Sequence, residues 1–300
     1  MASRNDYFKL HFIVFLWGFT AILGKLVTIP AVEMILYRAL LAAIGMCIVI
    51  AVTKGTFAVT RVELIKLLLI GAIVAIHWVA FFGSARVSNV SVSLVGFATN
   101  SLWAALLEPL FNRTRIKKFE LLLGLVVIAG LYIIFSFDFH YKFGLLLGIL
   151  AGFTSALFSV FNAKFVRSIP AFTITLYEMI GVFLTLALFL PVYKNTWAPD
   201  HTLHLVPSLT DFLYIAILAG VCSVYAYSVA VELMKKISVF MMQLSLNLEP
   251  LYGIAMAMII FKDKEKMGIN FYLGTLIILA AVALYPLLKR RYDHLYTEKK

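Results

Sequence analysis

The amino-acid sequence predicts an all-α integral membrane protein whose ten transmembrane helices form two inverted five-helix repeats. The first reason is composition: 63% of the 300 residues are hydrophobic, 14% are charged, and the mean hydropathy is +0.98. So little polar surface cannot coat a water-soluble globule. The second reason is that the apolar residues form continuous runs of bilayer-crossing length rather than short alternating strands. The third reason is an internal duplication.

The apolar runs predict ten spans joined by short loops. Pro30 and Pro170 open two of them, at a position where proline is pre-set for a helix and no needed backbone donor is lost. The longest loop, 192–209, is interpreted as a plain connection, with a partial lid as the alternative. In chain order the predicted spans are 8–27, 31–52, 63–86, 90–111, 119–136, 143–163, 170–191, 210–232, 237–260 and 268–288.

The duplication is clearest around the two prolines. The run Ile29-Pro-Ala-Val-Glu-Met-Ile-Leu-Tyr-Arg38 returns 140 residues later as Ile169-Pro-Ala-Phe-Thr-Ile-Thr-Leu-Tyr-Glu178. Each half holds five predicted spans, and an odd number turns the second half upside down relative to the first. The expected units are residues 1–140 and 141–300. Such inverted repeats are typical of secondary transporters, whose substrate site lies near the midplane between the halves.

Basic residues indicate the orientation. A net charge of +11 first suggests nucleic acid as a partner, but the lysines and arginines lie in short runs between the apolar spans, which excludes that reading. Of the 26 Lys and Arg residues, 18 fall on the side of the two termini. The positive-inside rule therefore predicts cytoplasmic termini in an inner, cytoplasmic membrane. The opposite side holds seven: Lys25, Arg86, Lys142, Lys194, Lys262, Lys264 and Lys266.

Arg38 and Glu178 occupy matching places in the two repeats. Eight residues beyond each proline puts them about 12 Å into a hydrocarbon layer about 30 Å thick. Charged side chains at that depth are costly, so they face a partner or a cavity. One interpretation is a structural ion pair that fixes the two halves in register. The other is that Arg38 recognises a carboxylate or phosphate while Glu178 holds an ammonium group or exchanges a proton.

Glu249 is a third acid in the middle of a predicted span. Pro250 follows it and frees a backbone carbonyl one turn earlier, with Gln243 and Asn247 just before. This pattern predicts a discontinuous helix that lines a cavity and presents Glu249, Gln243 and Asn247 to the substrate, the alternative being a packing kink. Glu108 stands in the same Leu-Glu-Pro-Leu motif but near a span end, where the basic loop of Arg113 and Arg115 is expected to balance it.

Further polar and aromatic side chains are expected at mid-depth. They are interpreted as substrate-binding because an aromatic ring with a polar edge suits an amphiphilic or cationic guest. For the histidine the alternative is a simple hydrogen bond to a neighbouring helix. The residues are Trp17, His77, Trp78, Asn100 and Tyr225.

Taken together, these features resemble the drug/metabolite transporter superfamily and its ten-helix EamA-like family. The resemblance covers nearly the whole chain, through Trp17-Gly18 and Lys25, the Pro30 to Arg38 segment, and Asn247-Leu-Glu-Pro250. It implies export or exchange of small metabolites, commonly amino acids, by alternating access through a central cavity. Glu178 departs from the family pattern, in which a neutral amide is common at this place.

The sequence therefore predicts a transporter of small metabolites, with amino acids and related compounds as the expected cargo and export as the expected direction. The alternative is a flippase for a lipid-linked or amphiphilic molecule. An enzyme is not expected, because His77 is the only histidine at mid-depth and lies too far from Ser84 to activate it. No cofactor is expected. The lipid bilayer and a small-molecule substrate are the expected partners, coupling to protons stays open, and a monomer suffices.

Overall fold

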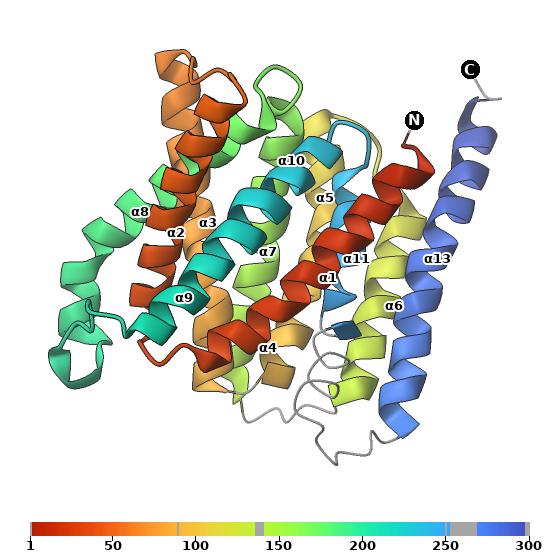
Figure 1. Cartoon of the computed structure of the whole chain (residues 1–300). Helices are drawn as coiled ribbons and strands as arrows, with labels where there is room; N and C mark the ends of the chain where they lie inside the picture. Colours follow the sequence, from red (N-terminus) through yellow and green to blue (C-terminus); the bar gives the residue numbers. More distant parts are fainter. Residues whose placement is uncertain (1, 89, 136–140, 250, 253–268, 298–300) are drawn as a thin grey trace.

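The computed structural model describes residues 2–88, 90–135, 141–249, 251–252 and 269–297. Throughout these ranges every regular element is helical (Figure 1). The α-helices are α1 (Arg4–Leu26), α2 (Ala31–Val52), α3 (Arg61–Val87), α4 (Val90–Phe97), α5 (Thr99–Asn112), α6 (Lys118–Phe135), α7 (Lys142–Phe165), α8 (Ala171–Thr196), α9 (Leu209–Ile217), α10 (Ser228–Leu233), α11 (Val239–Leu246) and α13 (Ile269–Thr297). A 3₁₀ turn, η2 (Pro199–His201), and a π-helix, η3 (Leu218–Tyr227), complete the set.

Seven helical segments of the described chain are long and apolar enough to cross a membrane. The predicted spans 8–27 and 119–136 coincide with α1 and α6, which are not among these seven. The second part of the predicted span 237–260 lies outside the described residues. The seven segments are Ala31–Val52, Arg61–Val87, Val92–Asn112, Lys142–Phe165, Ala171–Thr196, Leu209–Leu233 and Tyr272–His294.

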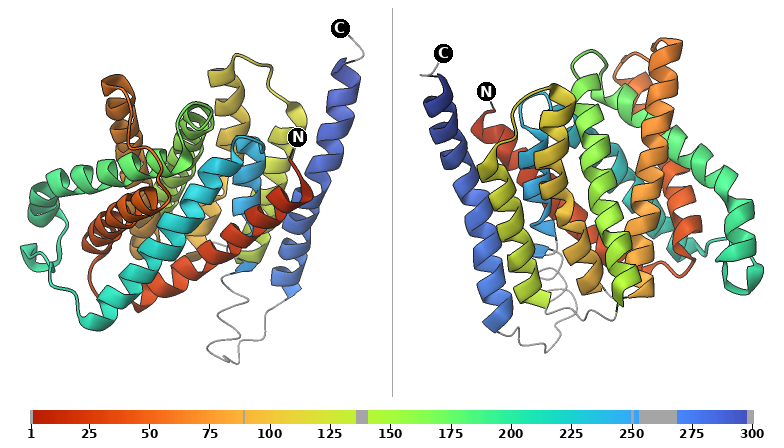
Figure 2. Two further views of the ribbon diagram at one scale, coloured as in Figure 1. Left: turned by 45° about the horizontal axis from the view of Figure 1, so that its top comes forward. Right: turned by 180° about the vertical axis from the view of Figure 1, so that it is seen from behind.

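The helices run back and forth between two ends of the molecule, and both termini lie at the same end (Figures 1 and 2). Helix α2 runs toward that end, whereas α8, which carries the repeated motif, runs away from it. Each of these helices begins directly after a proline that forms its N-cap: Pro30 precedes α2 and Pro170 precedes α8.

Helix α3 lies at the centre of the packing and contacts both α7 and α8. Glycines allow the close approach of α3 to α8. A Cβ atom built on Gly71 would lie 2.3 Å from the backbone oxygen of Glu178, and one built on Gly181 would lie 2.5 Å from that of Leu68. Small residues at helix contacts are common in membranes, where van der Waals packing drives association. The contact fixes α8, and with it Glu178, against α3.

Three irregular segments interrupt the predicted spans. The span 90–111 breaks at Ala98, between α4 and α5. The span 210–232 contains the π-helix η3, which continues directly from α9 and into α10. Helix α11 ends at Leu246, before Glu249, which agrees with the predicted discontinuous helix; Pro250 itself lies outside the described residues.

Glu108 corrects an expectation from the sequence. Its two carboxylate oxygens accept hydrogen bonds from the backbone amides of Val239 and Phe240, at 3.3 and 3.0 Å. These amides belong to the first turn of α11, where helical N–H groups have no partner within the helix. Glu108 therefore caps α11 rather than balancing Arg113 and Arg115.

The loop predicted at 192–209 is shorter in the structure, because α8 continues to Thr196. It lies at the end opposite the termini (Figure 1). The Tyr37 hydroxyl donates to the carbonyl of Leu205, and the His204 amide donates to Glu33 over 3.4 Å. The loop is thus bound to the first turns of α2, as a connecting segment would be.

Candidate functional site

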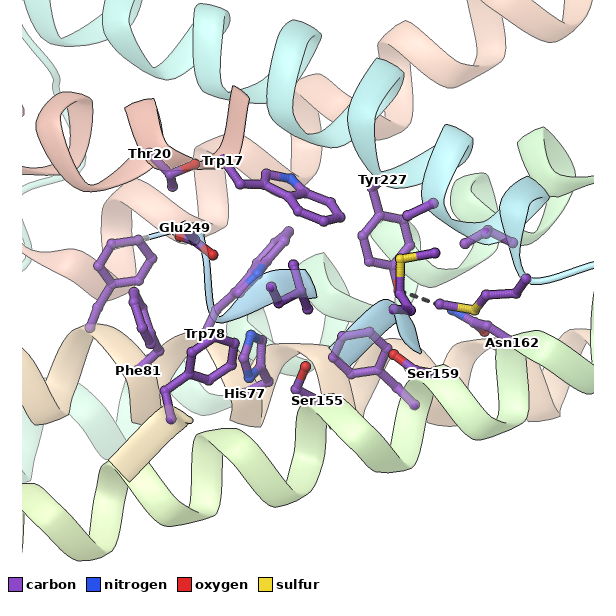
Figure 3. Close-up of a pocket in the computed structure, with 18 of the residues that line it drawn as sticks. Trp17, Thr20, His77, Trp78, Phe81, Ser155, Ser159, Asn162, Tyr227 and Glu249 are labelled. Atoms are coloured by element: carbon purple, nitrogen blue, oxygen red, sulfur yellow. Dashed lines mark hydrogen bonds between the residues drawn. The ribbon is translucent and has the colours of Figure 1, made fainter. Parts of the chain in front are cut away.

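A cavity of about 90 Å³ lies in the middle of the helix bundle (Figure 3). Helices from both halves of the chain contribute to its wall: α1, α2, α3, α4, α7, η3, α10 and α11, together with Glu249. Its lining residues are Trp17, Thr20, Arg38, His77, Trp78, Phe81, Phe82, Phe97, Ser155, Phe158, Ser159, Asn162, Tyr227, Ala230, Val231, Met234, Met242, Leu246 and Glu249.

Arg38 supplies the cation of this cavity. Its side chain is 3% exposed, and its Nε donates to the hydroxyl of Ser223 on η3, at 2.8 Å. The guanidinium carbon lies 4.3 Å from the centroid of the Trp78 ring. An arginine over an indole face is stabilised by the ring quadrupole, the more so when water is excluded. Ser223 and Trp78 therefore hold the guanidinium in place without neutralising its charge.

Glu249 supplies an anion to the same wall, just beyond the end of α11. Figure 3 shows it near Trp17 and Thr20. It attracts Arg38 through space, yet these two described side chains form no direct ion pair. The wall of the cavity thus carries a positive and a negative group that form no ion pair with each other.

Arg38 and Glu178 do not form the ion pair that one interpretation of the sequence predicts. The Glu178 carboxylate is fully buried and accepts hydrogen bonds from the Tyr227 hydroxyl at 2.8 Å and from the Asn162 amide at 3.3 Å. Within the described residues its Oε1 has no partner. Glu178 itself does not line the cavity, but Tyr227 and Asn162 do. The two residues occupy matching sequence positions on different helices, α2 and α8, and each has other partners.

Three amides predicted to bind substrate instead lie behind the wall. Gln243 donates to the Ser159 hydroxyl at 2.8 Å and accepts from the Ser155 hydroxyl at 3.1 Å. Asn247 donates to the side-chain oxygen of Asn100 at 3.3 Å. The cavity wall includes Ser155 and Ser159 but none of the three amides. We therefore assign them a positioning role.

Tyr225 is also not part of the cavity. Its side chain is 46% exposed and packs edge-on against Phe12, with ring centroids 6.4 Å apart. The reason is the π-helix η3, whose i→i+5 bonding places more residues in each turn than an α-helix does. A face drawn at α-helical spacing therefore drifts, and Tyr227 rather than Tyr225 reaches the cavity. No signal in the sequence marks the π-helix.

The remaining predicted residues, His77, Trp78 and Trp17, do line the cavity. The Nδ1 atom of His77 lies 2.8 Å from the carbonyl oxygen of Ala151. A carbonyl only accepts, so we assign the ring proton to Nδ1. Trp17 donates from its indole nitrogen to the carbonyl of Cys222 at 3.0 Å. The two tryptophans thus present fixed aromatic surfaces to the cavity.

Apart from Tyr227, the polar side chains that sequence reasoning missed are small. Thr20, Ser155, Ser159 and Asn162 line the cavity, and Thr20 has no hydrogen-bond partner among the described residues. Such residues are common in membrane helices, so their type alone does not mark a site. The described part of the chain brings together no three His, Cys, Asp or Glu side chains that could hold a metal ion.

Comparison with known proteins identifies a family and a fold. The model of the EamA-like transporter family matches residues 8–136 and 142–285. Among solved structures 28 chains match, and one of them, a crystal structure of a protein 14% identical, covers 97% of this chain and 100% of its own with a TM-score of 0.78. At that identity the likeness shows the fold alone. No curated protein matches the chain.

Proposed function

Because this chain belongs to the EamA-like transporter family, we propose that it exports amino acids or related small metabolites by alternating access. As a member of this family it is a multi-pass membrane protein that transports small molecules, and it is not an enzyme. The substrate class, the direction and the mechanism are the proposal, and the central cavity supports the substrate class and the mechanism.

The observation that carries the proposal is the unpaired arrangement of Arg38 and Glu249 on one cavity wall. An amino acid offers a carboxylate to the first and an ammonium group to the second. The indole rings of Trp17 and Trp78 give its side chain an apolar surface and add attraction for a cation. A substrate without ionised groups would need neither Arg38 nor Glu249.

The position of the cavity supports alternating access. Residues from both halves of the chain form its wall, and transporters built from inverted repeats bind their substrate near the midplane between the halves. Movement of one half against the other would then change the access to the cavity.

The direction of the helices supports an inverted repeat. Helix α2, which carries Arg38, and α8, which carries Glu178, begin after equivalent prolines and run in opposite directions (Figure 1). We propose ten spans in two units, 1–140 and 141–300, in a cytoplasmic membrane with both termini inside. The basic residues on the termini side favour this orientation.

Glu178 is proposed as the coupling residue. It lies outside the cavity but shares hydrogen bonds with two residues of the wall, Tyr227 and Asn162. A proton added to or removed from its carboxylate changes these bonds and hence the wall. Proton coupling therefore needs no contact between Glu178 and the substrate.

One chain contains both proposed five-helix units, so we propose that a monomer is sufficient for transport.

The experiment that tests the function is flux of labelled amino acids and related metabolites into proteoliposomes, with and without an imposed pH gradient. Saturable flux of a few related zwitterions is expected, with protein-free vesicles as the control. A response to the gradient would support proton coupling. Absence of flux for every soluble compound, in vesicles that contain folded protein, would contradict the proposal and favour lipid flipping.

A further inference from the structure

A second cleft, of about 510 Å³, opens at the end of the molecule where both termini lie. Its wall is formed by the last turns of α5 and α7 and by the connection between α10 and α11. These elements lie side by side at that end in both figures of the whole chain (Figures 1 and 2). The cleft plays no part in the site described so far.

Met234 belongs to the walls of both spaces. Its side chain is 6% exposed and lines the central cavity on one side and the cleft on the other. Helix α7 joins them as well, because Asn162 lines the cavity and the next residues, Ala163 and Lys164, line the cleft. Only a thin wall of side chains therefore separates the cleft from the cavity.

Two of the basic residues that line the cleft are paired with carboxylates, and two are not. Lys235 pairs with Glu232 at 2.9 Å and Lys236 pairs with Asp6 at 3.2 Å, so a carboxylate balances each of them. Lys164 donates instead to the backbone oxygen of Phe111 at 2.7 Å. The guanidinium group of Arg167 forms no hydrogen bond or ion pair with any described residue.

The one acid among the lining residues, Glu108, does not cancel these charges. Its carboxylate caps α11 through two backbone amides, where the positive end of the helix dipole faces it. Lys164 and Arg167 are both exposed and have no carboxylate partner in the described chain, so they leave the cleft positively charged.

We propose that this cleft is a vestibule that gathers carboxylate-bearing substrates, and that Met234 closes it from the central cavity. The proposal rests on the proposed function and specifies the substrate class further: metabolites with a carboxylate and no excess of positive charge. A basic cleft with low-dielectric walls raises the local concentration of anions and speeds their arrival. Lys164 and Arg167 attract the carboxylate before Arg38 binds it in the cavity.

Charged thiol reagents test the vestibule without any transport assay. Met234→Cys in nanodiscs is reacted with a negatively charged methanethiosulfonate and, separately, with a positively charged one of similar size. We expect the anionic reagent to react about tenfold faster at low salt, within the range of electrostatic steering. Raising the salt to about 1 M shortens the Debye length to about 3 Å, so the preference should vanish. Protein without the substitution gives the background from Cys47 and Cys222.

Charge variants identify the residues responsible. Arg167→Gln in the Met234→Cys protein should lower the preference severalfold, and Lys164→Gln combined with it should remove the preference. Arg61→Gln is the matched control, since Arg61 is exposed at the same end but does not line the cleft. It should leave the preference unchanged.

Three results would overturn the inference: equal rates for the two reagents, rates that do not respond to Arg167→Gln in folded protein, or no reaction at Met234→Cys with either. Size-exclusion profiles show whether a variant has folded. None of these results depends on flux. A vestibule that labels as expected in a protein without flux would instead contradict the proposed function alone.

Discussion

The guanidinium of Arg38 lies over the indole ring of Trp78, so neighbouring helices place a cation on an aromatic face. When water is excluded, such a contact is worth about 2 kcal/mol. It stabilises the buried charge of Arg38 without a carboxylate from the protein. The charge therefore stays free to bind one from a substrate, which an ion pair with Glu178 would have prevented.

Arg38→Ala should abolish flux while the protein stays folded in the membrane. Arg38→Lys should also lower flux at least about tenfold, because lysine has neither the Nε–H that Ser223 accepts nor a planar group for the Trp78 face. Initial rates of proteoliposome uptake measure both. Arg61→Gln, an exposed change outside the cavity, should keep normal rates. Near-normal flux in Arg38→Ala would contradict the substrate site.

Glu178→Gln should abolish flux without unfolding the protein. Glutamine keeps the size of the side chain, and its carbonyl oxygen can replace Oε2, which accepts from both Tyr227 and Asn162. It cannot exchange a proton, which is the role proposed for Glu178. Uptake with and without a pH gradient tests the change. Glu232→Gln is the control, because Glu232 is exposed and pairs only with Lys235 among the described residues. A variant that transports normally and still responds to the gradient would rule out Glu178 as the coupling residue.

The helical fold follows from simple features of the sequence. Long apolar runs and the prolines before α2 and α8 need only local information, and both helices begin where expected. The depth of Arg38 follows from the helical rise, and the structure places its side chain on the cavity wall. The interruption before Glu249 was likewise visible as an acid beside a proline.

The parts of the site that could not be predicted depend on contacts between distant helices. Whether Arg38 contacts Glu178 depends on how α2, α8 and η3 pack against one another. The spacing of residues within either repeat does not predict that packing. Tyr225 is expected among the mid-depth residues of the site, but Tyr227 lines the cavity instead, because the π-helical bonding of η3 has no sequence signature. Gln243 is an amide at mid-depth, and only the structure shows that its side chain is hydrogen-bonded to Ser155 and Ser159, behind the cavity wall.

Asp6 predicts a pH dependence at the termini end of the fold. Hydrogen bonds from the backbone amide and hydroxyl of Ser3 lower the pKa of Asp6 from 3.8 to about 2, with help from Lys236. A lowered pKa means that the carboxylate stabilises the fold above pH 3.8 and loses this effect as the pH falls toward 2. Asp6→Asn should therefore lower the melting temperature in detergent by a constant amount from pH 7 to about pH 5. The difference should shrink below pH 4, and a difference that disappears already near pH 6 would contradict this assignment.

Gly71→Ala should destabilise the protein and reduce flux together. The added methyl would lie 2.3 Å from the backbone oxygen of Glu178 and 2.8 Å from the Cα of Gly181, and backbone atoms cannot move aside as a side chain can. Overpacking of this kind typically costs about 1–3 kcal/mol, here by pushing α8 away from α3. Because α8 carries Glu178, which accepts hydrogen bonds from the cavity residues Tyr227 and Asn162, the shift disturbs the wall of the site. Thermal unfolding in detergent and initial uptake rates measure the two effects.

Gly220→Ala is the matched control, since its methyl meets no atom within 4 Å, and its melting temperature should match or exceed that of the unmodified protein. Equal melting temperatures for the two variants would show that α3 and α8 are not in close contact in the membrane.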